Sequence, residues 1–364
     1  MVADLGKGQL LFDLRGAAER PPASVEKLYT AVAVLRLLGP DERLATTVLG
    51  SGHLAADGTW RGNLYLRGGG DPTFGDGTFN RLYEQGYGPT ATALARALLA
   101  RGIRRVTGRL YGDESLLSTE RGGMLTDLRP DIPDFGGELS ALTYDHGQTG
   151  TSSSPAAFAA HELAATLRAM GVRVQAARWA ARTPASALPL AVVHSPPMEV
   201  LLRLMNVPSD DLFAELLAEQ LGVRFGGGGT IAAGAQVIAR VISSTYGLHP
   251  TILDGSGLDR SDRSSPLEVV QFLRELWGTR TGRLLYATLP LVGREGTVQT
   301  IAARTAAAGR CAAKTGTLTD VTNLAGYCSA RGGRELAFAI FIDGPPNWVA
   351  MQAIGRMLAA IARY

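Results

Sequence analysis

The sequence predicts an α+β protein in which an inserted module interrupts a first domain. The chain has 364 residues, which is more than one hydrophobic core usually fills. Helical periodicity occurs near the N-terminus, whereas strand-like runs dominate the last third. Between them, short apolar runs are broken by Gly, Asp and Pro. We therefore expect one domain from residues 1–47 and 187–364, and an inserted α+β module at 48–186.

The N-terminal segment predicts a strand and then a helix. Gln9–Leu14 is strand-like, and a turn that contains Pro21-Pro22 follows it. From Ser24 onward, apolar residues have helical spacing, at Val25, Leu28, Tyr29, Val32 and Leu35. Ser24 stands at a preferred N-cap position, and Gly39-Pro40 ends the helix. This spacing places Ser24 and Lys27 one turn apart on one face.

Short strands and two helices are expected inside the module. The strands are expected at Asn63–Arg67 and Gly108–Gly112, and the helices near Thr90–Arg101 and Ser154–Met170. The glycine cluster Gly68–Gly70 has no following Gly-Lys-Ser or Gly-Lys-Thr, so it indicates a turn rather than a phosphate-binding loop.

The last part of the chain predicts helices followed by an antiparallel meander. Helices are expected at Glu199–Met205, at Ser209–Leu221 and from Thr230 to about Tyr246. A hairpin of Arg310–Leu318 and Asn323–Ala330, a strand at Glu335–Ile342, and a closing helix with Trp348, Met351, Ile354, Leu358 and Ile361 on its core face are expected next. Asp254, Asp259 and Asp262 are expected in a solvated loop.

Charge and hydropathy exclude several classes of protein. The 36 basic and 33 acidic residues leave a net charge of +3, and no basic stripe interleaved with aromatic residues predicts a nucleic-acid partner. The apolar run Leu336–Ile342 is far shorter than the roughly 20 residues of a membrane span. Met1–Gln9 is too polar for a signal peptide, so we expect none in this chain. The 5 histidines have no metal-ligand spacing, and neither a metal nor a cofactor is expected.

Three short motifs carry chemistry. Ser24-Val25-Glu26-Lys27 places an ammonium beside a hydroxyl at a helix start, where backbone N–H groups can face an oxyanion. Lys is rare in this chain, which uses Arg for nearly every other positive charge, and only Lys can give up its proton. Ser209-Asp210-Asp211 opens a helix. Lys314-Thr315-Gly316-Thr317 lies on a predicted strand, where hydroxyls beside Lys can hold a carboxylate and a glycine indicates close approach.

The ordered set resembles the S-x-x-K, S-x-N and K-T-G motifs of penicillin-recognising serine acyl enzymes. Further landmarks resemble the D-alanyl-D-alanine carboxypeptidase/endopeptidase branch of low-molecular-mass penicillin-binding proteins, which carries inserted domains. These landmarks are Leu66–Pro72, Tyr111–Ser115, His194–Pro197, Asp254–Leu258 and Gly293–Thr297. The resemblance covers about Gln9 to the C-terminus, and it implies a penicillin-binding transpeptidase fold with an antiparallel sheet between helices.

The resemblance also implies roles for individual residues. Ser24 would be the acylated nucleophile, Lys27 its base, Ser209 a proton relay, and Lys314 the cation that supports it. Thr315 and Thr317 would bind the substrate carboxylate, with Gly316 between them, and the N–H groups of Ser24 and Thr317 would form the oxyanion hole. Arg260, and less strongly Asp113 in the module, would contact the stem peptide. The implied partners are peptidoglycan stem peptides and β-lactam antibiotics, which places the protein outside the cytoplasmic membrane.

Asp211 departs from the motif, which has Asn at this position. Asn offers a donor and an acceptor, whereas an ionised Asp offers acceptors only. A carboxylate beside Lys27 would stabilise its ammonium form and repel the substrate carboxylate. We therefore expect Asp211 to lower activity. If its carboxyl is protonated, or turns to pair with Lys314 or a nearby arginine, the substitution costs little. The alternative function is a catalytically weakened relative that binds peptidoglycan or β-lactams.

The only two cysteines, Cys311 and Cys328, lie on the two strands of the predicted hairpin. A symmetric turn would place them opposite each other, within disulfide reach. A register shift of one residue would separate them, so a disulfide and two buried free thiols both remain open.

Overall fold

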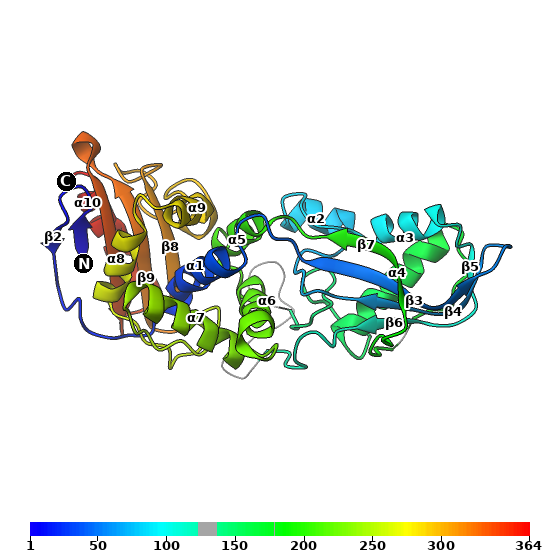
Figure 1. Ribbon diagram of the computed structural model, residues 1–364. Coiled ribbons are helices and arrows are strands. Elements are labelled where there is room, and N and C mark those ends of the chain that lie inside the picture. The colour runs from blue at the N-terminus through cyan, green and yellow to red at the C-terminus, as the bar shows by residue number, and fades with distance from the viewer. Residues whose placement is uncertain (123–136, 178) are drawn as a thin grey trace. The chain divides into compact units, whose positions relative to one another are not determined.

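The computed structural model describes residues 1–122, 137–177 and 179–364, and these form two compact units (Figure 1). Unit 1 comprises residues 1–41, 198–227 and 231–364, and unit 2 comprises residues 42–197 and 228–230. Unit 2 is therefore wider than the expected module 48–186. The reason is that its strands extend beyond those limits at both ends, to Ala45 and His194.

Unit 1 is built on an antiparallel sheet with the strand order β2-β1-β10-β9-β8. The strands are β1 Val2–Asp4, β2 Gln9–Phe12, β8 Cys311–Leu318, β9 Val321–Ser329 and β10 Glu335–Asp343. The last three form the meander that the sequence predicts. In the described part of the chain, β8 is one of the two edge strands, and only the isolated bridge between Leu291 and Ala312 pairs on its outer side.

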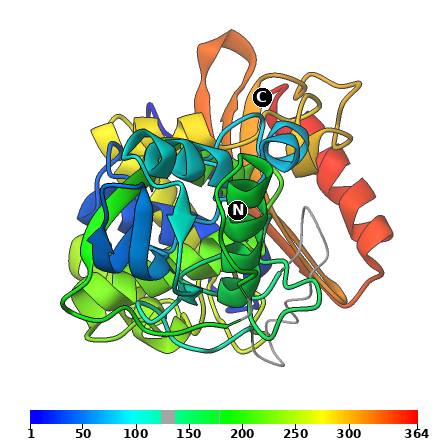
Figure 2. The same ribbon diagram turned by 90° about the vertical axis from the view of Figure 1, so that its right-hand side faces the viewer.

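Helices pack on both faces of this sheet, α10 on one and α8 on the other, and further helices pack against these and each other. The helices of unit 1 are α1 Lys27–Leu37, α5 Met198–Asn206, α6 Asp211–Leu221, α7 Ile231–Tyr246, α8 Pro266–Leu276, α9 Arg280–Thr288 and α10 Asn347–Ile361. On one face, Ile354 and Leu358 of α10 join Leu324 in a buried cluster (red helix in Figure 2). On the other face, the Tyr327 hydroxyl donates to the Leu273 carbonyl of α8 at 2.9 Å. The predicted α+β fold, with an antiparallel sheet between helices, is confirmed.

Unit 2 has a mixed sheet with the order β5-β4-β3-β7, and β6 also pairs with β4. Its strands are β3 Ala45–Leu54, β4 Thr59–Arg67, β5 Arg105–Val106, β6 Leu110–Asp113 and β7 Leu188–His194. Its helices are α2 Gly77–Tyr83, α3 Ala91–Ala100 and α4 Pro155–Ala169. Leu64, Leu98 and Leu163, from β4, α3 and α4, share one buried cluster, which is the core of this unit.

Local geometry corrects two of the expected helix starts. Ser24 is not an N-cap, because it lies inside a 3-10 turn, Ala23–Glu26, that precedes α1. Ser209 does not begin α6 either. Asp210 caps that helix by accepting from the Phe213 N–H at 3.0 Å, and Ser209 has a φ of +71° outside it. In both places the serine is held in a turn, with its hydroxyl free of the helix backbone.

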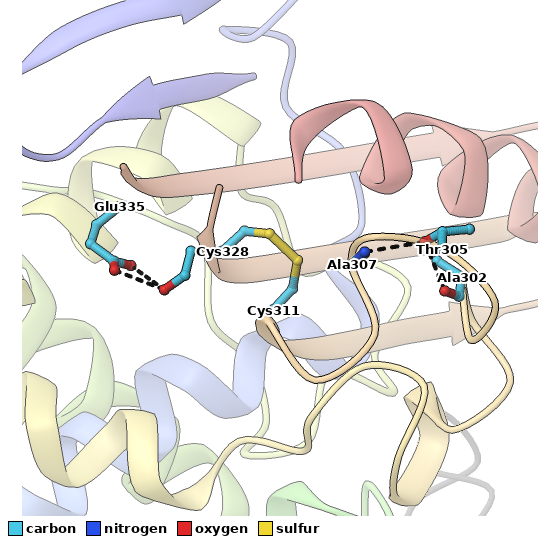
Figure 3. The surroundings of a disulfide bond; sticks show 7 residues. Ala302, Thr305, Ala307, Cys311, Cys328 and Glu335 are labelled. Carbon is cyan, nitrogen blue, oxygen red and sulfur yellow. Dashed lines mark hydrogen bonds between the residues drawn. A yellow bond between two sulfur atoms is a disulfide. The ribbon is translucent and has the colours of Figure 1, made fainter. Parts of the chain in front are cut away.

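The cysteine pair is bonded. Cys311 lies directly opposite Cys328 in the β8–β9 register, and the two sulfur atoms form a disulfide (Figure 3). Both residues are fully buried. The bond begins the strand that continues to Lys314, so it ties the strand to β9 three residues before the motif.

We expect no free thiols when the unfolded, unreduced chain is titrated with a thiol reagent. A disulfide that closes a loop of this length is worth about 3 kcal/mol, so Cys311→Ser/Cys328→Ser should lower the free energy of unfolding by about that amount. Reducing agent should have little effect on the stability of this double variant. Two titratable thiols in the unreduced wild-type chain would contradict the bond.

Candidate active site

Ser24 lies on a turn that neighbouring segments hold in an uncommon conformation. Ala23, just before it, has a φ of +48°, in the region that favours glycine. The Asn323 side-chain amide, from β9, donates to the carbonyls of Pro21 and Pro22, each at 2.9 Å. Such backbone strain persists only where surrounding contacts determine it. Asn323 supplies two of these contacts and thereby fixes the approach to Ser24.

Two glycines allow other backbone segments to reach the same turn. A Cβ on Gly316 would lie 2.5 Å from the Pro22 carbonyl oxygen, and one on Gly257 would lie 2.0 Å from the Ala23 carbonyl oxygen. The close approach expected at Gly316 is therefore present. Gly257 also has a φ of +83°, which side chains disfavour. Strand β8 and the Asp254–Gly257 loop thus pack directly against the turn.

Lys27 is fully buried, and its ammonium has three acceptors. Its Nζ donates to Ser24 Oγ at 3.0 Å, to Asp211 Oδ1 at 2.5 Å and to the Ser256 carbonyl at 2.9 Å. An ammonium has three N–H donors, so this set satisfies it completely. All three donors of Lys27 are therefore used, and the hydroxyl of Ser24 is one of its partners.

Asp211 lies in the first turn of α6 and is almost fully buried. Burial raises the pKa of its carboxyl, and the adjacent Lys27 ammonium opposes this change. The sequence left open whether this carboxylate turns toward Lys314 or an arginine. The structure pairs it with Lys27. This is the arrangement in which we expect the carboxylate to stabilise the ammonium form and so to lower activity.

A second serine and lysine form a matching pair. Lys314 Nζ donates to Ser209 Oγ at 2.6 Å and to the Thr315 carbonyl at 3.0 Å. Lys314 is fully buried, and burial, helped by the positive charge of Lys27, lowers its pKa well below the ordinary value. Since Lys314 gives up a proton more easily than an exposed lysine, this pair is suited to moving a proton through Ser209.

The outer edge of β8 presents backbone groups for a ligand. The Cys311 carbonyl accepts from Val292 and the Ala313 N–H donates to the Pro290 carbonyl, so these odd-numbered residues point away from β9. Backbone groups alternate along an antiparallel strand, so the N–H groups of Thr315 and Thr317 also face outward. Thr315 Oγ1 lies 2.8 Å from Thr297 Oγ1, and Thr317 is exposed.

The two residues expected to contact a stem peptide lie in different units. Arg260 in unit 1 is exposed, and its guanidinium donates to the Thr319 carbonyl at 2.9 Å, just beyond β8. Asp113 in unit 2 ends β6 and accepts from the N–H groups of Thr183 at 2.8 Å and Ser115 at 3.0 Å. Burial of Asp113 works against these hydrogen bonds, which nevertheless keep its pKa below the ordinary value.

The expected solvated loop is instead buried beneath Lys27. Asp254 is 2% exposed and Asp262 is 0% exposed. Asp254 accepts from the N–H groups of Ser256, Gly257 and Asp259, and this ring of bonds turns the Ser256 carbonyl toward Lys27. A carboxylate followed by Gly-Ser-Gly was the signal for such a turn. Its burial depends on tertiary packing, which the pattern did not reveal.

Other supporting residues were also missed. Glu215 of α6 is fully buried and accepts from the N–H groups of Gly255 and Ser256, the latter at 3.0 Å. No role was predicted for Asn323 or for Thr297, although Thr297 ends the landmark Gly293–Thr297. A polar residue inside an apolar strand was an available signal for Asn323, but nothing local indicated its partners.

Comparisons with known proteins agree with this geometry. The model of the D-Ala-D-Ala carboxypeptidase 3 (S13) family matches residues 1–148 and 135–363. A D-alanyl-D-alanine carboxypeptidase of Actinomadura sp. is 27% identical over 100% of this chain and 81% of its own length. Carboxypeptidase DacB of Mycolicibacterium smegmatis is 30% identical over 98% of this chain and 79% of its own length.

Solved structures show the same fold. Penicillin binding protein 4 of Haemophilus influenzae matches with a TM-score of 0.83 at 20% identity, over 100% of this chain and 96% of that one. A predatory endopeptidase of Bdellovibrio bacteriovorus, in complex with an immunity protein, matches with a TM-score of 0.66 at 18% identity, over 99% and 92%.

We expect Asp211→Asn to increase the rate of acylation by penicillin at pH 7 and to move the pH optimum lower. A neighbouring carboxylate typically shifts a titration by about 1 to 3 pKa units, so removing it should raise the rate by about tenfold or more where neutral amine is limiting. Stopped-flow acylation from pH 6 to 9 measures this, and Asp210→Asn in the adjacent cap serves as the control. An Asn variant no faster than wild type at any of these pH values would show that Asp211 does not limit the base.

Proposed function

The chain belongs to the D-Ala-D-Ala carboxypeptidase 3 (S13) family, and from that premise we propose that Ser24 is its acylated nucleophile. It is a serine-type D-alanyl-D-alanine peptidase of the carboxypeptidase/endopeptidase group, and its substrates are peptidoglycan stem peptides. The observation that carries the assignment is the pair of buried lysines, each hydrogen-bonded to one serine hydroxyl.

Acylation begins at the Ser24 hydroxyl. In its neutral amine form, Lys27 lies within hydrogen-bond distance of Ser24 Oγ, at 3.0 Å, and takes its proton as the oxygen attacks the acyl carbon of D-Ala-D-Ala. The developing oxyanion accepts hydrogen bonds from the backbone N–H groups of Ser24 and Thr317. The N–H of Thr317 faces outward from the edge of β8. No other described lysine has this relation to a serine at a helix start.

Departure of the terminal amine requires a proton on the other side of the site. We assign the delivery of this proton to the hydroxyl of Ser209. Lys314, which is hydrogen-bonded to Ser209 Oγ at 2.6 Å, then gives Ser209 a proton in return. The C–N bond then breaks, and D-Ala leaves, with an ester on Ser24. Water then attacks the ester and gives a proton through Ser209 to Lys314, while Lys27 returns its proton to the Ser24 oxygen. These transfers restore the free enzyme.

Substrate orientation depends on β8. A stem peptide that pairs with its outer edge as an added strand places the scissile carbonyl against Thr317, and edge strands favour this mode of binding. The terminal carboxylate of the substrate would lie at the hydroxyls of Thr315 and Thr317, with Lys314 as the adjacent cation. We assign Arg260 and Asp113 to contacts with the rest of the stem peptide.

The proposed location is outside the cytoplasmic membrane. Peptidoglycan lies there, and a Cys311–Cys328 disulfide is typical of exported proteins. In the described part of the chain, no helix is both long and apolar enough to cross a bilayer. The relatives that the chain matches are carboxypeptidases and a penicillin-binding protein, which accords with this location.

We expect penicillin to form one covalent adduct per chain, on Ser24. Ser24 combines a position at a helix start with a lysine one turn away, which the Ser209 pair lacks. Intact-mass analysis followed by peptide mapping checks this, with Ser24→Ala as the test variant and Ser261→Ala, an exposed serine, as the control. An adduct that persists in Ser24→Ala, or that maps to Ser209, would contradict the assignment of Ser24 as the nucleophile.

Lys27→Arg should lose acylation although it keeps the positive charge. Arg does not deprotonate in proteins and therefore cannot serve as the base. We expect a decrease of at least about a hundredfold in the rate, which is within the usual contribution of a general base. Circular dichroism and the melting temperature check that the variant folds. A folded, fully active Lys27→Arg enzyme would refute the role of Lys27.

A further inference from the structure

Glu26, the residue between Val25 and Lys27, has a carboxyl group without a donor. Its side chain is 0% exposed, and among the described residues no donor reaches either of its oxygens. Oδ2 of Asp262, which is also 0% exposed, lacks a donor as well. One oxygen each from Glu26, Asp254 and Asp262 lie within 4.8 Å of one another. A buried carboxylate without a donor or a cation is costly, so this group requires a proton or a positive charge.

The nearby lysines do not satisfy Glu26. The charged groups that act on it are Asp254 and Asp262 of the adjacent loop and Glu215 of α6, and the nearest cations are Lys27, which follows it in the chain, and Lys314 beyond Lys27. All three Nζ–H groups of Lys27 are taken, by Ser24, Asp211 and the Ser256 carbonyl. Lys314 donates to Ser209 and the Thr315 carbonyl. Acids outnumber bases in this region.

A proton fits the free oxygens better than a metal ion. Both oxygens of Asp254 already accept backbone N–H groups, and Oδ1 of Asp262 accepts from the Leu253 N–H at 2.8 Å. This leaves two oxygens of Glu26 and one of Asp262. Calcium takes about six to eight oxygen ligands, and magnesium usually retains several waters, which a fully buried cluster does not supply. One proton on Glu26, in contrast, supplies the donor that Asp262 Oδ2 lacks.

We propose that Glu26 is a neutral carboxylic acid that donates a hydrogen bond to Asp262, and that this acid–carboxylate pair positions the loop that holds Lys27. The positioning role rests on the proposed function, whereas the shared proton does not. Placing the proton on Glu26 follows from the donors, because Asp262 already has one and Glu26 has none.

The route from Glu26 to Lys27 is short. A Cβ on Gly257 would lie 3.1 Å from the Glu26 Cβ, so the loop packs against this side chain. The preceding residue of the loop, Ser256, supplies the carbonyl that accepts from Lys27 at 2.9 Å. An ionised Glu26 would repel Asp262 and Asp254 and thereby displace that carbonyl. Glu26 is thus a positioning residue that acts through the loop.

The titration of the pair agrees with the geometry. Burial, and then the negative charges of Asp262 and Asp254, raises the pKa of Glu26 well above its ordinary value. Burial and the charge of Asp254 also raise the pKa of Asp262, whereas its hydrogen bond with Glu26 lowers it. The folded chain therefore holds a proton that the unfolded chain releases above the ordinary pKa of Glu. The stability of the folded chain therefore falls as the pH rises from the ordinary pKa of Glu toward the raised pKa of Glu26. The folding equilibrium constant decreases by up to about tenfold for each pH unit.

Urea unfolding of the wild type and of Glu26→Gln, from pH 5 to 9, tests the shared proton. The Gln amide keeps a donor toward Asp262 and cannot ionise, so the variant should be the more stable form. Its advantage should widen with pH by up to about tenfold per unit in the folding equilibrium. Asp262→Asn should also reduce the pH dependence, since its amide donates to Glu26, and the exposed Glu19→Gln is the matched control. An advantage for Glu26→Gln that does not change with pH would overturn the proposal, as would a loss of stability.

The rate of acylation by penicillin tests positioning. Glu26→Ala lacks the donor and should be slower by about tenfold to a hundredfold, since small displacements of a catalytic group have effects of this size. Glu26→Gln should recover most of this loss and should retain its rate at alkaline pH, where the wild type declines. Equal rates and parallel pH profiles in the Ala and Gln variants would remove the positioning role.

A metal ion is tested on the wild type directly. Treatment with EDTA, followed by addition of Ca²⁺ or Mg²⁺, should leave the melting temperature unchanged. A drop that either ion restores, and that Glu26→Gln lacks, would establish a cation site in place of the proton. If penicillin fails to react with the wild type at all, the proposed function fails, while the urea experiment still decides the state of Glu26.

Discussion

The buried ammonium of Lys27 is the interaction on which the rest of the site depends. A charge withdrawn from water is tolerated only where partners replace the lost hydration. Its three acceptors come from the turn before α1, from α6 and from the Asp254–Gly257 loop. Removing any one leaves a buried N–H without a partner, so the three segments are fixed together. The same requirement leaves the nucleophilic hydroxyl as one partner of the base.

Steric constraints act on the same turn from the opposite side. Strand β8 and the loop reach the backbone at Ala23 only because Gly316 and Gly257 lack side chains. Asn323 then holds the two proline carbonyls that precede it. Electrostatic and steric restraints therefore converge on four residues, Pro21–Ser24. The strained conformation of Ala23 is held in place by both of them, which accounts for a rigid nucleophile at the start of a buried helix.

Much of this arrangement could be predicted from the sequence. Periodicity located α1, α4, α7 and α10 and the β8–β10 meander, and the three motifs identified the residues that the structure brings together in unit 1. Helix α8 was missed although Ser265 and Glu268 form a capping box, a signal that the sequence does contain. Other features depend on tertiary contacts. Burial of the Asp254–Asp262 loop, the hydrogen bonds from Asn323 to the proline carbonyls and the proximity of Glu26 to Asp262 depend on residues far apart in the sequence and leave no local pattern.

The disulfide and the reactive lysine share one strand, and a strand has a period of two. Odd-numbered residues of β8 direct their backbone groups to the outer edge, and Cys311 and Ala313 pack on the side of α10. Even-numbered residues carry Lys314 and Gly316 to the opposite face. A single inserted or deleted residue between Cys311 and Lys314 would turn the lysine into the apolar core, whereas a change of two would keep both faces correct. The length of this segment can therefore evolve only in even steps while the cross-strand bond to Cys328 is retained.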